Sequence, residues 1–421
     1  MRGFRRPQVQ TLVERIEETP QRLIAIFGPR QTGKTTAALQ ALASTRLPGV
    51  RLAADEPETG SVGPLPTEAD GPGPPSPDRD SRWLARVWQE SRAKAWNSDA
   101  GFVLVLDEIH KVDGWSGVVK GLWDADRISG CPLRVVLIGS APLLMKAGMD
   151  ESLTGRFETL RFEHWSYSEM AEAFGFGLDQ YVYFGGCPGA AGLTSDPDRW
   201  VGYMRAALVE PSIDRDVLEM QRVDKPALLR QLFEYGSRCS GQILSYNKML
   251  GHLQDAGNTT TLTRYLHLLS QAGLLTGLSN HTGSPVSARA STPKLNVLDT
   301  AFMSAVCGYS FEEARADRSH WGRVVESAVG AHLVNTASVS TSVKYWRDRN
   351  NEVDFVLHRG PSLVGIEVKS GITPPRHRAL AAFRQRFSPR SVITVGADVA
   401  LDEFLSRPAD YWIERRDGPG R

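Results

Sequence analysis

The chain has 421 residues, which exceeds one ordinary hydrophobic core and predicts two or three domains. A formal net charge of +1, with 41% hydrophobic and 23% charged residues, excludes a global electrostatic pull toward nucleic acid or a membrane. The four cysteines contain no CxxC pair, so neither a disulfide framework nor a cysteine zinc site is expected.

The first predicted element is a short helix from Val9 to Glu18, which Thr19-Pro20 ends. The N-terminus before it is basic, but no apolar signal core follows it. No apolar run in the chain reaches the length of a membrane span. We therefore expect a cytoplasmic protein with no membrane partner.

The apolar strand Leu23–Phe27 leads into a glycine-containing loop, and a helix follows. The loop reads Gly28-Pro29-Arg30-Gln31-Thr32-Gly33-Lys34-Thr35-Thr36, which is the GxxxxGK(S/T) pattern of a P-loop, or Walker A motif. Its two glycines let backbone N–H groups converge on phosphate oxygens, and the helix N-terminus points its positive end at them. Lys34 adds a cation for the β- and γ-phosphates, and the Thr35 hydroxyl adds a ligand for Mg²⁺. The sequence therefore predicts a site for ATP and Mg²⁺.

A second strand is expected at Val50–Ala53. Residues 56–80 are rich in Pro and Gly and cannot build a packed core, so they predict a surface loop or a disordered insertion. Helical spacing returns at Arg82–Trp96.

Continuous apolar runs at Phe102–Leu106 and Leu133–Ile138 predict buried parallel strands, and Leu160–Phe162 is a shorter candidate. Strands that alternate with helices predict an α/β fold, with a parallel sheet covered by helices on both faces. We expect residues 1–165 to form this P-loop domain.

The strand at Phe102–Leu106 ends in Asp107-Glu108, the Walker B arrangement. Asp107 is expected in the Mg²⁺ shell, and Glu108 is expected to activate the attacking water. The next strand ends at Gly139-Ser140, where Ser140 is either a sensor of the γ-phosphate or a turn serine.

Four segments together resemble the prokaryotic AAA-type ATPases called archaeal-type predicted ATPases. They are the P-loop, Leu106-Asp107-Glu108-Ile109-His110, Ile138-Gly139-Ser140-Ala141 and Ser152-Leu153-Thr154-Gly155-Arg156-Phe157. The likeness continues through Tyr183-Phe184-Gly185-Gly186-Cys187-Pro188-Gly189 and Ile213-Asp214-Arg215-Asp216-Val217, and ends in a segment like the family's uncharacterised C-terminal domain, here Trp346–Lys369.

The resemblance implies an ATP-hydrolysing enzyme and gives Arg156 a role as an arginine finger or sensor. The alternative is an arginine that holds a loop through a surface ion pair. A finger that acts on a neighbouring chain would require a homo-oligomer, which the sequence leaves open.

Residues 166–292 read as mostly helical, beginning with the capping box Ser166-Tyr167-Ser168-Glu169. Helices at Ala227–Tyr235, Ser245–Leu253 and Thr259–Ala272 precede a strand at Leu274-Leu275. This is a winged-helix order, as the resemblance also implies. Such a module either touches nucleic acid or serves as a lid or protein contact.

Residues 293–421 return to mixed strands and helices. A helix at Gly322–Val329 carries Glu326, a strand at Glu352–Leu357 carries Asp354, and a strand at Leu363–Lys369 places Glu367 and Lys369 on one face. Two acids that meet across adjacent strands, with a lysine beside them, suit a Mg²⁺ site that acts on phosphate.

This arrangement resembles the α/β PD-(D/E)xK restriction-endonuclease fold, with Asp354, Glu367 and Lys369 matching its core and Glu326 its helical acid. The first hypothesis is an ATPase coupled to this nuclease-like domain, which acts on DNA or RNA. The alternative is an ATP-driven switch whose C-terminal domain is an inactive scaffold that binds a protein partner.

Overall fold

The computed structural model of the protein describes residues 3–55, 79–139, 148–149, 152–218, 223–255, 257–283, 292–371 and 377–415. The chain forms two compact units. The N-terminal unit comprises Arg5–Gly28 and Gly33–Phe162, and the C-terminal unit comprises the chain from Glu163 together with Pro29–Thr32 and the residues up to Phe4. Within the described ranges, no helix is both long enough and apolar enough to cross a membrane.

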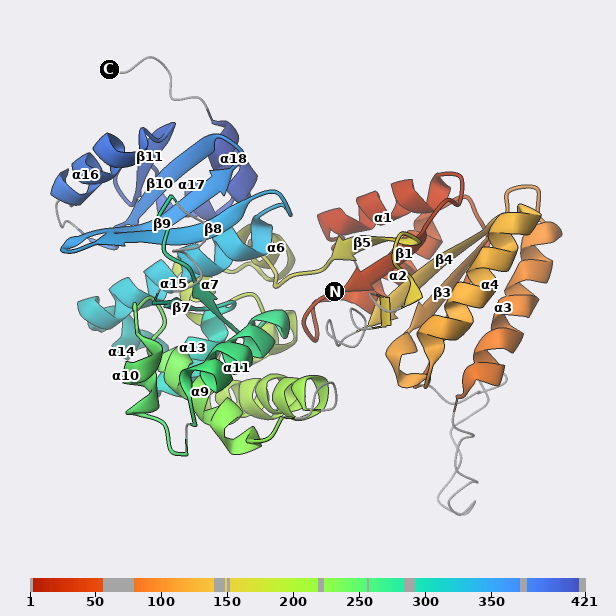
Figure 1. The fold of residues 1–421 in the computed structure, drawn as a ribbon, viewed down its shortest axis with the longest axis horizontal. Coiled ribbons are helices and arrows are strands. Elements are labelled where there is room, and N and C mark those ends of the chain that lie inside the picture. The colour runs from red at the N-terminus through yellow and green to blue at the C-terminus, as the bar shows by residue number, and fades with distance from the viewer. Residues whose placement is uncertain are drawn as a thin grey trace. The chain divides into compact units, whose positions relative to one another are not determined.

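The N-terminal unit is built on a five-stranded parallel sheet of strand order β2-β3-β4-β1-β5 (Figure 1). Its strands are β1 (Leu23–Phe27), β2 (Gly49–Ala53), β3 (Phe102–Asp107), β4 (Leu133–Gly139) and β5 (Phe157–Arg161). The parallel P-loop-type α/β sheet predicted from the sequence is therefore confirmed.

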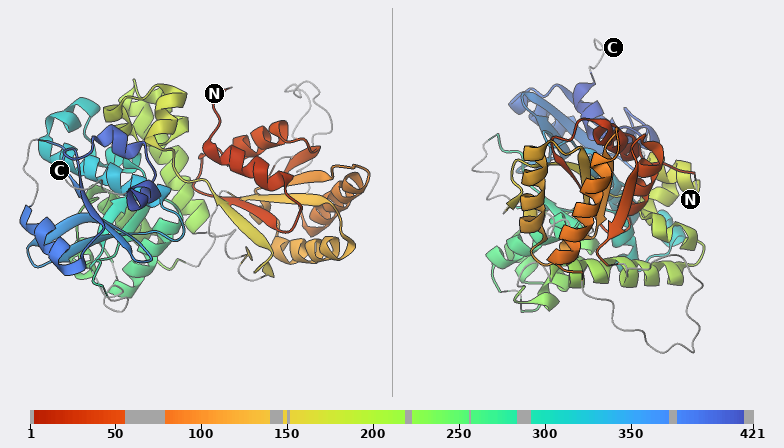
Figure 2. Two further views of the ribbon diagram at one scale, coloured as in Figure 1. Left: turned by 90° about the horizontal axis from the view of Figure 1, so that it is seen from above. Right: turned by 90° about the vertical axis from the view of Figure 1, so that its right-hand side faces the viewer.

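Helices cover both faces of this sheet (Figures 1 and 2). They are α1 (Pro7–Glu17), α2 (Lys34–Ser44), α3 (Ser81–Trp96) and α4 (Trp115–Ser129). Alternate strand residues serve the two faces: Ile24 and Ile26 pack with α1 and α2, whereas Leu23 and Ala25 belong to the core that α3 and α4 cover. This alternation explains why the strands read as continuous apolar runs.

Strand β5 begins three residues earlier than the predicted strand Leu160–Phe162. The apolar pair Leu160 and Phe162 suggested a strand at that point, but β5 begins at Phe157. It is an edge strand, in which only Leu160 is buried, and its two apolar residues, Phe157 and Leu160, do not form a continuous apolar run. Of the predicted insertion at 56–80, residues 56–78 lie outside the described residues.

The C-terminal unit has helices on either side of a short strand pair in the chain, at 275–278 and 294–297. These helices are α6 (Tyr167–Phe174), α7 (Leu178–Phe184), α8 (Pro197–Tyr203), α9 (Pro226–Arg238), α10 (Tyr246–Leu250), α11 (Thr259–Gln271), α13 (Thr300–Cys307), α14 (Phe311–Ala316) and α15 (Arg318–Thr336). Two stretches the sequence did not predict, Met204–Val209 and Ser212–Val217, are π-helical. The predicted capping box opens α6, where the Glu169 carboxylate accepts from Ser166 N (2.8 Å).

A two-stranded antiparallel ribbon follows α11. It pairs β6 (Leu275–Leu278) with β7 (Lys294–Val297). Three helices and a ribbon appear in the predicted order, and the winged-helix assignment stays a prediction. The ribbon joins strands on either side of the expected border at 292/293, and the structure places both sides in one compact unit.

The chain ends in a four-stranded mixed sheet of order β11-β10-β9-β8. Its strands and remaining helices are β8 (Ser342–Asp348), β9 (Asn351–Arg359), β10 (Ser362–Val368), α16 (His377–Phe387), β11 (Ser391–Val395), α17 (Leu401–Leu405) and α18 (Ala409–Glu414). Strand β9 runs antiparallel to β8 and β10, and β10 runs parallel to β11. Leu380 and Phe383 of α16 pack in a core with Trp346, Val353 and Val356.

Candidate nucleotide site and carboxylate cluster

The predicted P-loop lies between the end of β1 and the start of α2. Gly33 has φ of 87°, a left-handed conformation that favours glycine, and it precedes the first helical residue, Lys34. A Cβ atom on Gly28 would lie 2.0 Å from the Phe162 carbonyl oxygen, so no larger residue fits there. Both glycines are therefore required by the path of the backbone.

Two of the polar side chains in the loop, Thr32 and Lys34, fold back onto the loop's own carbonyl groups. The buried Lys34 ammonium donates to the Gly28 carbonyl oxygen (3.0 Å), and the Thr32 hydroxyl donates to the Pro29 carbonyl oxygen (3.0 Å). Thr35 and Thr36 fall in the first turn of α2. The backbone N–H groups of this turn and the lysine together present positive charge at the loop.

Walker A and Walker B meet directly. Thr35 Oγ1 donates to Asp107 Oδ2 (2.8 Å), although the two residues are 72 positions apart. Asp107 is the last residue of β3 and is 2% exposed. A hydroxyl and a carboxylate oxygen are hard ligands of the kind that Mg²⁺ prefers, so these residues fit the predicted ion.

Arg51 is a site residue that sequence reasoning missed. From β2, its Nε and Nη2 atoms both lie 2.9 Å from Asp107 Oδ2. The register pairs Ala53 with Asp107, which brings Arg51, two residues earlier and on the same face, within reach of that carboxylate. The contact between Arg51 and Asp107 could not be predicted, because the sequence alone does not show that β2 lies beside β3 in this register.

Glu108 follows β3 in a left-handed conformation with φ of 52°. Its Oε2 atom lies 3.3 Å from Nε2 of His110 in the short 3-10 helix Ile109–Lys111. The structure therefore places the expected general base next to Asp107, with a histidine that orients its carboxylate. The expected sensor, Ser140, lies outside the described residues.

In the C-terminal unit, the structure brings the predicted acids together. Phe355 pairs with Ile366 across β9 and β10, so Asp354 and Glu367 are neighbours on adjacent strands. The Val368 backbone N–H donates to Asp354 Oδ2 (2.8 Å), and Lys369 Nζ donates to Glu367 Oε1 (2.6 Å). Glu367 is completely buried.

A lysine that the sequence did not single out lies at the centre of this cluster. Lys294 of β7 is completely buried, and its Nζ atom lies 2.5 Å from Glu326 Oε1 and 3.8 Å from Asp354 Oδ1. Glu352 Oε1 is 4.0 Å away, and the same ammonium donates to the Asp354 carbonyl oxygen. We call Lys294, Glu326, Glu352, Asp354, Glu367 and Lys369 the carboxylate cluster.

In this cluster, burial and neighbouring charges shift the pKa values of the side chains in opposite directions. Burial raises the pKa of Glu326 to about 7, although the Lys294 ammonium acts in the opposite direction. Burial alone would lower the pKa of Lys294, but the surrounding carboxylates of Glu326, Asp354 and Glu352 outweigh it and raise that pKa. The lysine is therefore held as a cation by the acids that surround it.

Comparisons with known proteins assign the first part of the chain. Residues 20–171 match a family model described as "AAA domain". The N-terminal unit carries a P-loop ATPase domain. Residues 176–313 and 321–403 match models described as domains of unknown function, DUF8612 and DUF4143. No curated protein matches the chain.

The chain is similar to solved structures at low sequence identity. The Walker-type ATPase PABY2304 of Pyrococcus abyssi is 14% identical with a TM-score of 0.42, over 72% of this chain and 95% of that one. The RuvB Holliday junction branch migration motor of Thermotoga maritima is 14% identical with a TM-score of 0.30, over 67% and 93%. The assignment to the archaeal-type predicted ATPases and to a nuclease-like fold stays a prediction.

Arg156 does not face the P-loop of its own ATPase domain. Its carbonyl oxygen accepts from Leu23 N, at the first residue of β1, whereas the P-loop follows Phe27 at the other end. Four residues of extended strand separate the two edges by about 13 Å. The guanidinium forms a two-bond ion pair with Asp124 (2.7 and 3.0 Å), which is the surface-pair alternative. A sensor role in the same chain is therefore incompatible with this position, and a role on a neighbouring chain stays a prediction.

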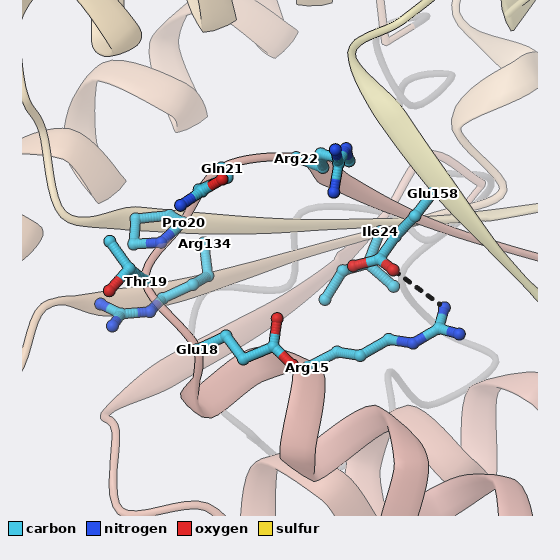
Figure 3. A pocket seen from close by; sticks show the side chains of 9 residues that line it. All are labelled: Arg15, Glu18, Thr19, Pro20, Gln21, Arg22, Ile24, Arg134 and Glu158. Atoms are coloured by element: carbon cyan, nitrogen blue, oxygen red, sulfur yellow. Dashed lines mark ion pairs between the residues drawn. The ribbon is translucent and has the colours of Figure 1, made fainter.

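A cavity of about 300 Å³ lies at that same edge of the ATPase domain (Figure 3). It is lined by Arg15, Glu18, Thr19, Pro20, Gln21, Arg22, Ile24, Arg134 and Glu158. Arg15 pairs with Glu158 (3.5 Å), and Arg134 Nε donates to the Ile16 carbonyl oxygen (3.1 Å). These two arginines hold neighbouring segments of the domain, and the cavity is not the predicted nucleotide site.

Proposed function

We propose that the chain binds ATP together with Mg²⁺ and hydrolyses the bond between the β- and γ-phosphates. The hydrogen bond between Thr35 and Asp107 supports this proposal most strongly, because it unites the ends of Walker A and Walker B at one point. Thr35 and Asp107 would hold the ion. When bound, Mg²⁺ neutralises charge that develops on the phosphate oxygens.

The remaining steps fall to side chains of the ATPase domain. Lys34 exchanges the Gly28 carbonyl oxygen for phosphate oxygens, which are stronger acceptors because they are charged. Glu108 accepts a proton from the attacking water, and His110 keeps the Glu108 carboxylate in position. Arg51 balances the charge of the buried Asp107 carboxylate.

The test is ATP binding and turnover by the full-length chain and by Lys34→Ala. The variant is expected to lose turnover and to bind ATP weakly while its circular dichroism is unchanged, because the loop loses the lysine that pairs with phosphate. Lys120→Ala, an exposed lysine on α4, is the matched control. Wild-type turnover in Lys34→Ala would overturn the proposal.

We propose, as a second activity, that the carboxylate cluster binds a divalent cation and cleaves phosphodiester bonds of DNA or RNA. Its four carboxylates and two ammonium groups leave a formal charge of −2 when all are ionised, which one Mg²⁺ or Mn²⁺ would neutralise. The carboxylate oxygens fit such an ion. Lys369 would stabilise charge on a phosphate, as the pairing of its ammonium with Glu367 suggests.

The second activity is tested with the full-length chain on DNA and RNA panels, with and without ATP, in Mg²⁺ or Mn²⁺. Asp354→Asn and Glu367→Gln are expected to abolish cleavage and to weaken Mn²⁺ binding. Asp348→Asn, at the exposed end of β8, is the control. If the full-length chain neither binds metal at the cluster nor cleaves nucleic acid, the C-terminal unit is the partner-binding scaffold of the alternative hypothesis, while the ATPase proposal stands.

A further inference from the structure

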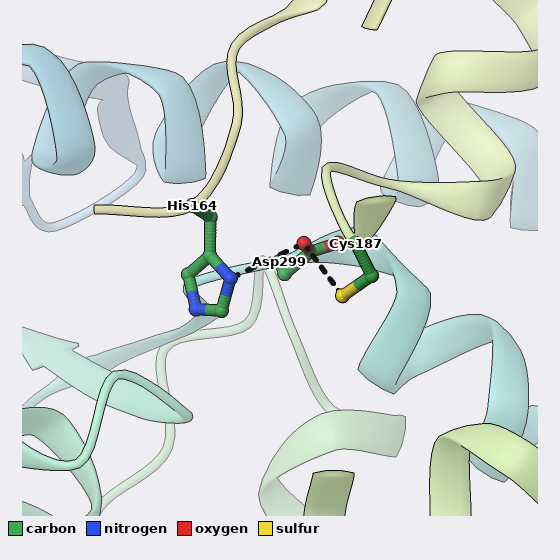
Figure 4. Close-up of side chains that lie close together, drawn as sticks. All are labelled: His164, Cys187 and Asp299. Atoms are coloured by element: carbon green, nitrogen blue, oxygen red, sulfur yellow. Dashed lines mark hydrogen bonds and ion pairs between the residues drawn. The ribbon is translucent and has the colours of Figure 1, made fainter. Parts of the chain in front are cut away.

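Three side chains of different chemistry meet inside the C-terminal unit (Figure 4). His164 precedes α6, Cys187 follows α7, and Asp299 is the N-cap of α13. All three are buried, with exposed fractions of 8%, 7% and 3%. Asp299 Oδ2 lies 3.4 Å from His164 Nδ1 and 3.3 Å from Cys187 Sγ.

The hydrogen bonds of His164 leave one ring nitrogen facing the carboxylate. Its Nε2 atom lies 2.7 Å from the Gly273 carbonyl oxygen. Because a carbonyl oxygen can only accept, Nε2 carries the proton of this bond. Nδ1 and Asp299 Oδ2 are then two acceptors at 3.4 Å, unless a second proton or a cation lies between them. This is the arrangement in which a metal-binding histidine is oriented through its other nitrogen.

The carboxylate of Asp299 is held in place by the backbone. Its Oδ1 accepts from Ala301 N (2.9 Å), and its Oδ2 accepts from Gly186 N (2.9 Å). The second lone pair of Oδ2 points toward His164 and Cys187 and can accept a hydrogen bond or bind a metal ion there. The three side chains therefore converge from segments that are each fixed by main-chain contacts.

We propose that His164 Nδ1, Cys187 Sγ and Asp299 Oδ2 bind one divalent transition metal ion of the Zn²⁺ class. Zinc bonds of about 2.0 to 2.3 Å in tetrahedral geometry separate ligand atoms by roughly 3.3 to 3.6 Å. The distances from Asp299 Oδ2 to His164 Nδ1 and to Cys187 Sγ match this range, and all three atoms lie within 4.8 Å of one another. A thiolate and a carboxylate balance the two positive charges of the ion, so the buried site is neutral.

A fourth ligand position has space for water. A cavity of about 10 Å³, lined by His164, Asp299, Tyr181, Asn335 and six other residues, adjoins two of the three ligands. This volume is about the minimum that accommodates one water molecule. The ion would therefore have three protein ligands and one water, and it would tie together segments more than a hundred residues apart.

Metal binding displaces the proton of Cys187. Burial and the neighbouring Asp299 carboxylate raise the pKa of the Cys187 thiol, so the metal-free thiol is protonated and donates to Asp299. On binding, the S–H bond breaks, its electron pair forms the sulfur–metal bond, and the proton passes to the solvent. No oxidant or reductant is required.

The test is Co²⁺ and Zn²⁺ binding by the reduced full-length chain after removal of metal with a chelator. The expected result is one equivalent of Co²⁺ with a sulfur-to-cobalt charge-transfer band, which Zn²⁺ abolishes by displacement. Cys187→Ser should lose the band, and His164→Gln should lower the Co²⁺ affinity at least tenfold. Cys131→Ser, a buried thiol of the N-terminal unit, is the matched control and should keep the band.

A second measurement covers variants that fail to fold. Zn²⁺ added to the unaltered chain should slow amide hydrogen exchange in peptides around residues 164, 187 and 299, and not around Cys131. The absence of a stoichiometric charge-transfer band, or a band that persists in folded Cys187→Ser, would overturn the proposal and leave a buried histidine–aspartate ion pair. The ATPase assay is not part of either measurement, so the outcome is independent of the proposed hydrolysis.

Discussion

Replacing Lys294 with Met tests whether the carboxylate cluster is balanced by an internal cation. The ammonium is fully buried, 2.5 Å from Glu326 and 3.8 Å from Asp354, so its loss leaves at least two acids without compensation. Removing one partner of a buried ion pair typically costs about 3–5 kcal/mol. We expect a loss of this size in the free energy of opening of the sheet β8–β10, while methionine keeps most of the side-chain volume.

The loss should depend on pH. The folded-state pKa of Glu326 is about 7, above its ordinary value of 4.5, so its ionisation disfavours the fold and stability falls as pH rises through that window. Without Lys294 this pKa rises further, because the attraction that lowers it is gone. The destabilisation by Lys294→Met should therefore be smaller near pH 5 than near pH 8.

The measurement is native-state hydrogen exchange of peptides from 342–368 in increasing urea, in the full-length chain. Lys248→Met, an exposed lysine of α10, is the control, and it should change the opening free energy little. If Lys294→Met behaved like this control at both pH values, the reasoning from burial and charge would be refuted. A further expectation is tighter Mn²⁺ binding by Lys294→Met near pH 8, since the competing internal cation is absent.

Two further predictions concern the ATPase domain. Glu108→Gln should bind ATP with unchanged affinity and hydrolyse it on the order of 10²–10⁴ times more slowly, because the general base is lost. Phosphate release measures the turnover, and the control variant Asp113→Asn should keep the wild-type rate. If Glu108→Gln also kept the wild-type rate, Glu108 would have no role in hydrolysis. If Arg156 acts on a neighbouring chain, turnover per protomer should rise with protein concentration, and Arg156→Ala should flatten this rise without unfolding the domain. A rate that is independent of concentration, from a chain that sedimentation shows to be monomeric with ATP, would contradict that role.

The sequence predicted the parts of the structure that local pattern determines. The P-loop, the strand that ends in Asp107-Glu108 and the capping box at Ser166 each depend on neighbouring residues, and each is found where it was expected. Edge strand β5 was displaced, because a strand with one buried residue has no apolar run to detect.

The contacts that depend on pairing were not predictable. Arg51 reaches Asp107 only because β2 lies beside β3, and Lys294 reaches Glu326 only because β7 lies against α15. In a single sequence, Arg51 reads as an ordinary strand position, and no strand was predicted at Lys294. The cluster of His164, Cys187 and Asp299 was invisible for the same reason, since its members share no spacing.

The pairing of β6 with β7 decides how this protein can be divided. A fragment that starts at Pro293 would keep β7, lose its partner strand and expose an unpaired backbone edge. A fragment that starts after β7 would instead leave Glu326 and Asp354 without the buried ammonium of Lys294. Any fragment or recombinant of this chain must therefore carry the ribbon β6–β7 and the sheet β8–β11 together.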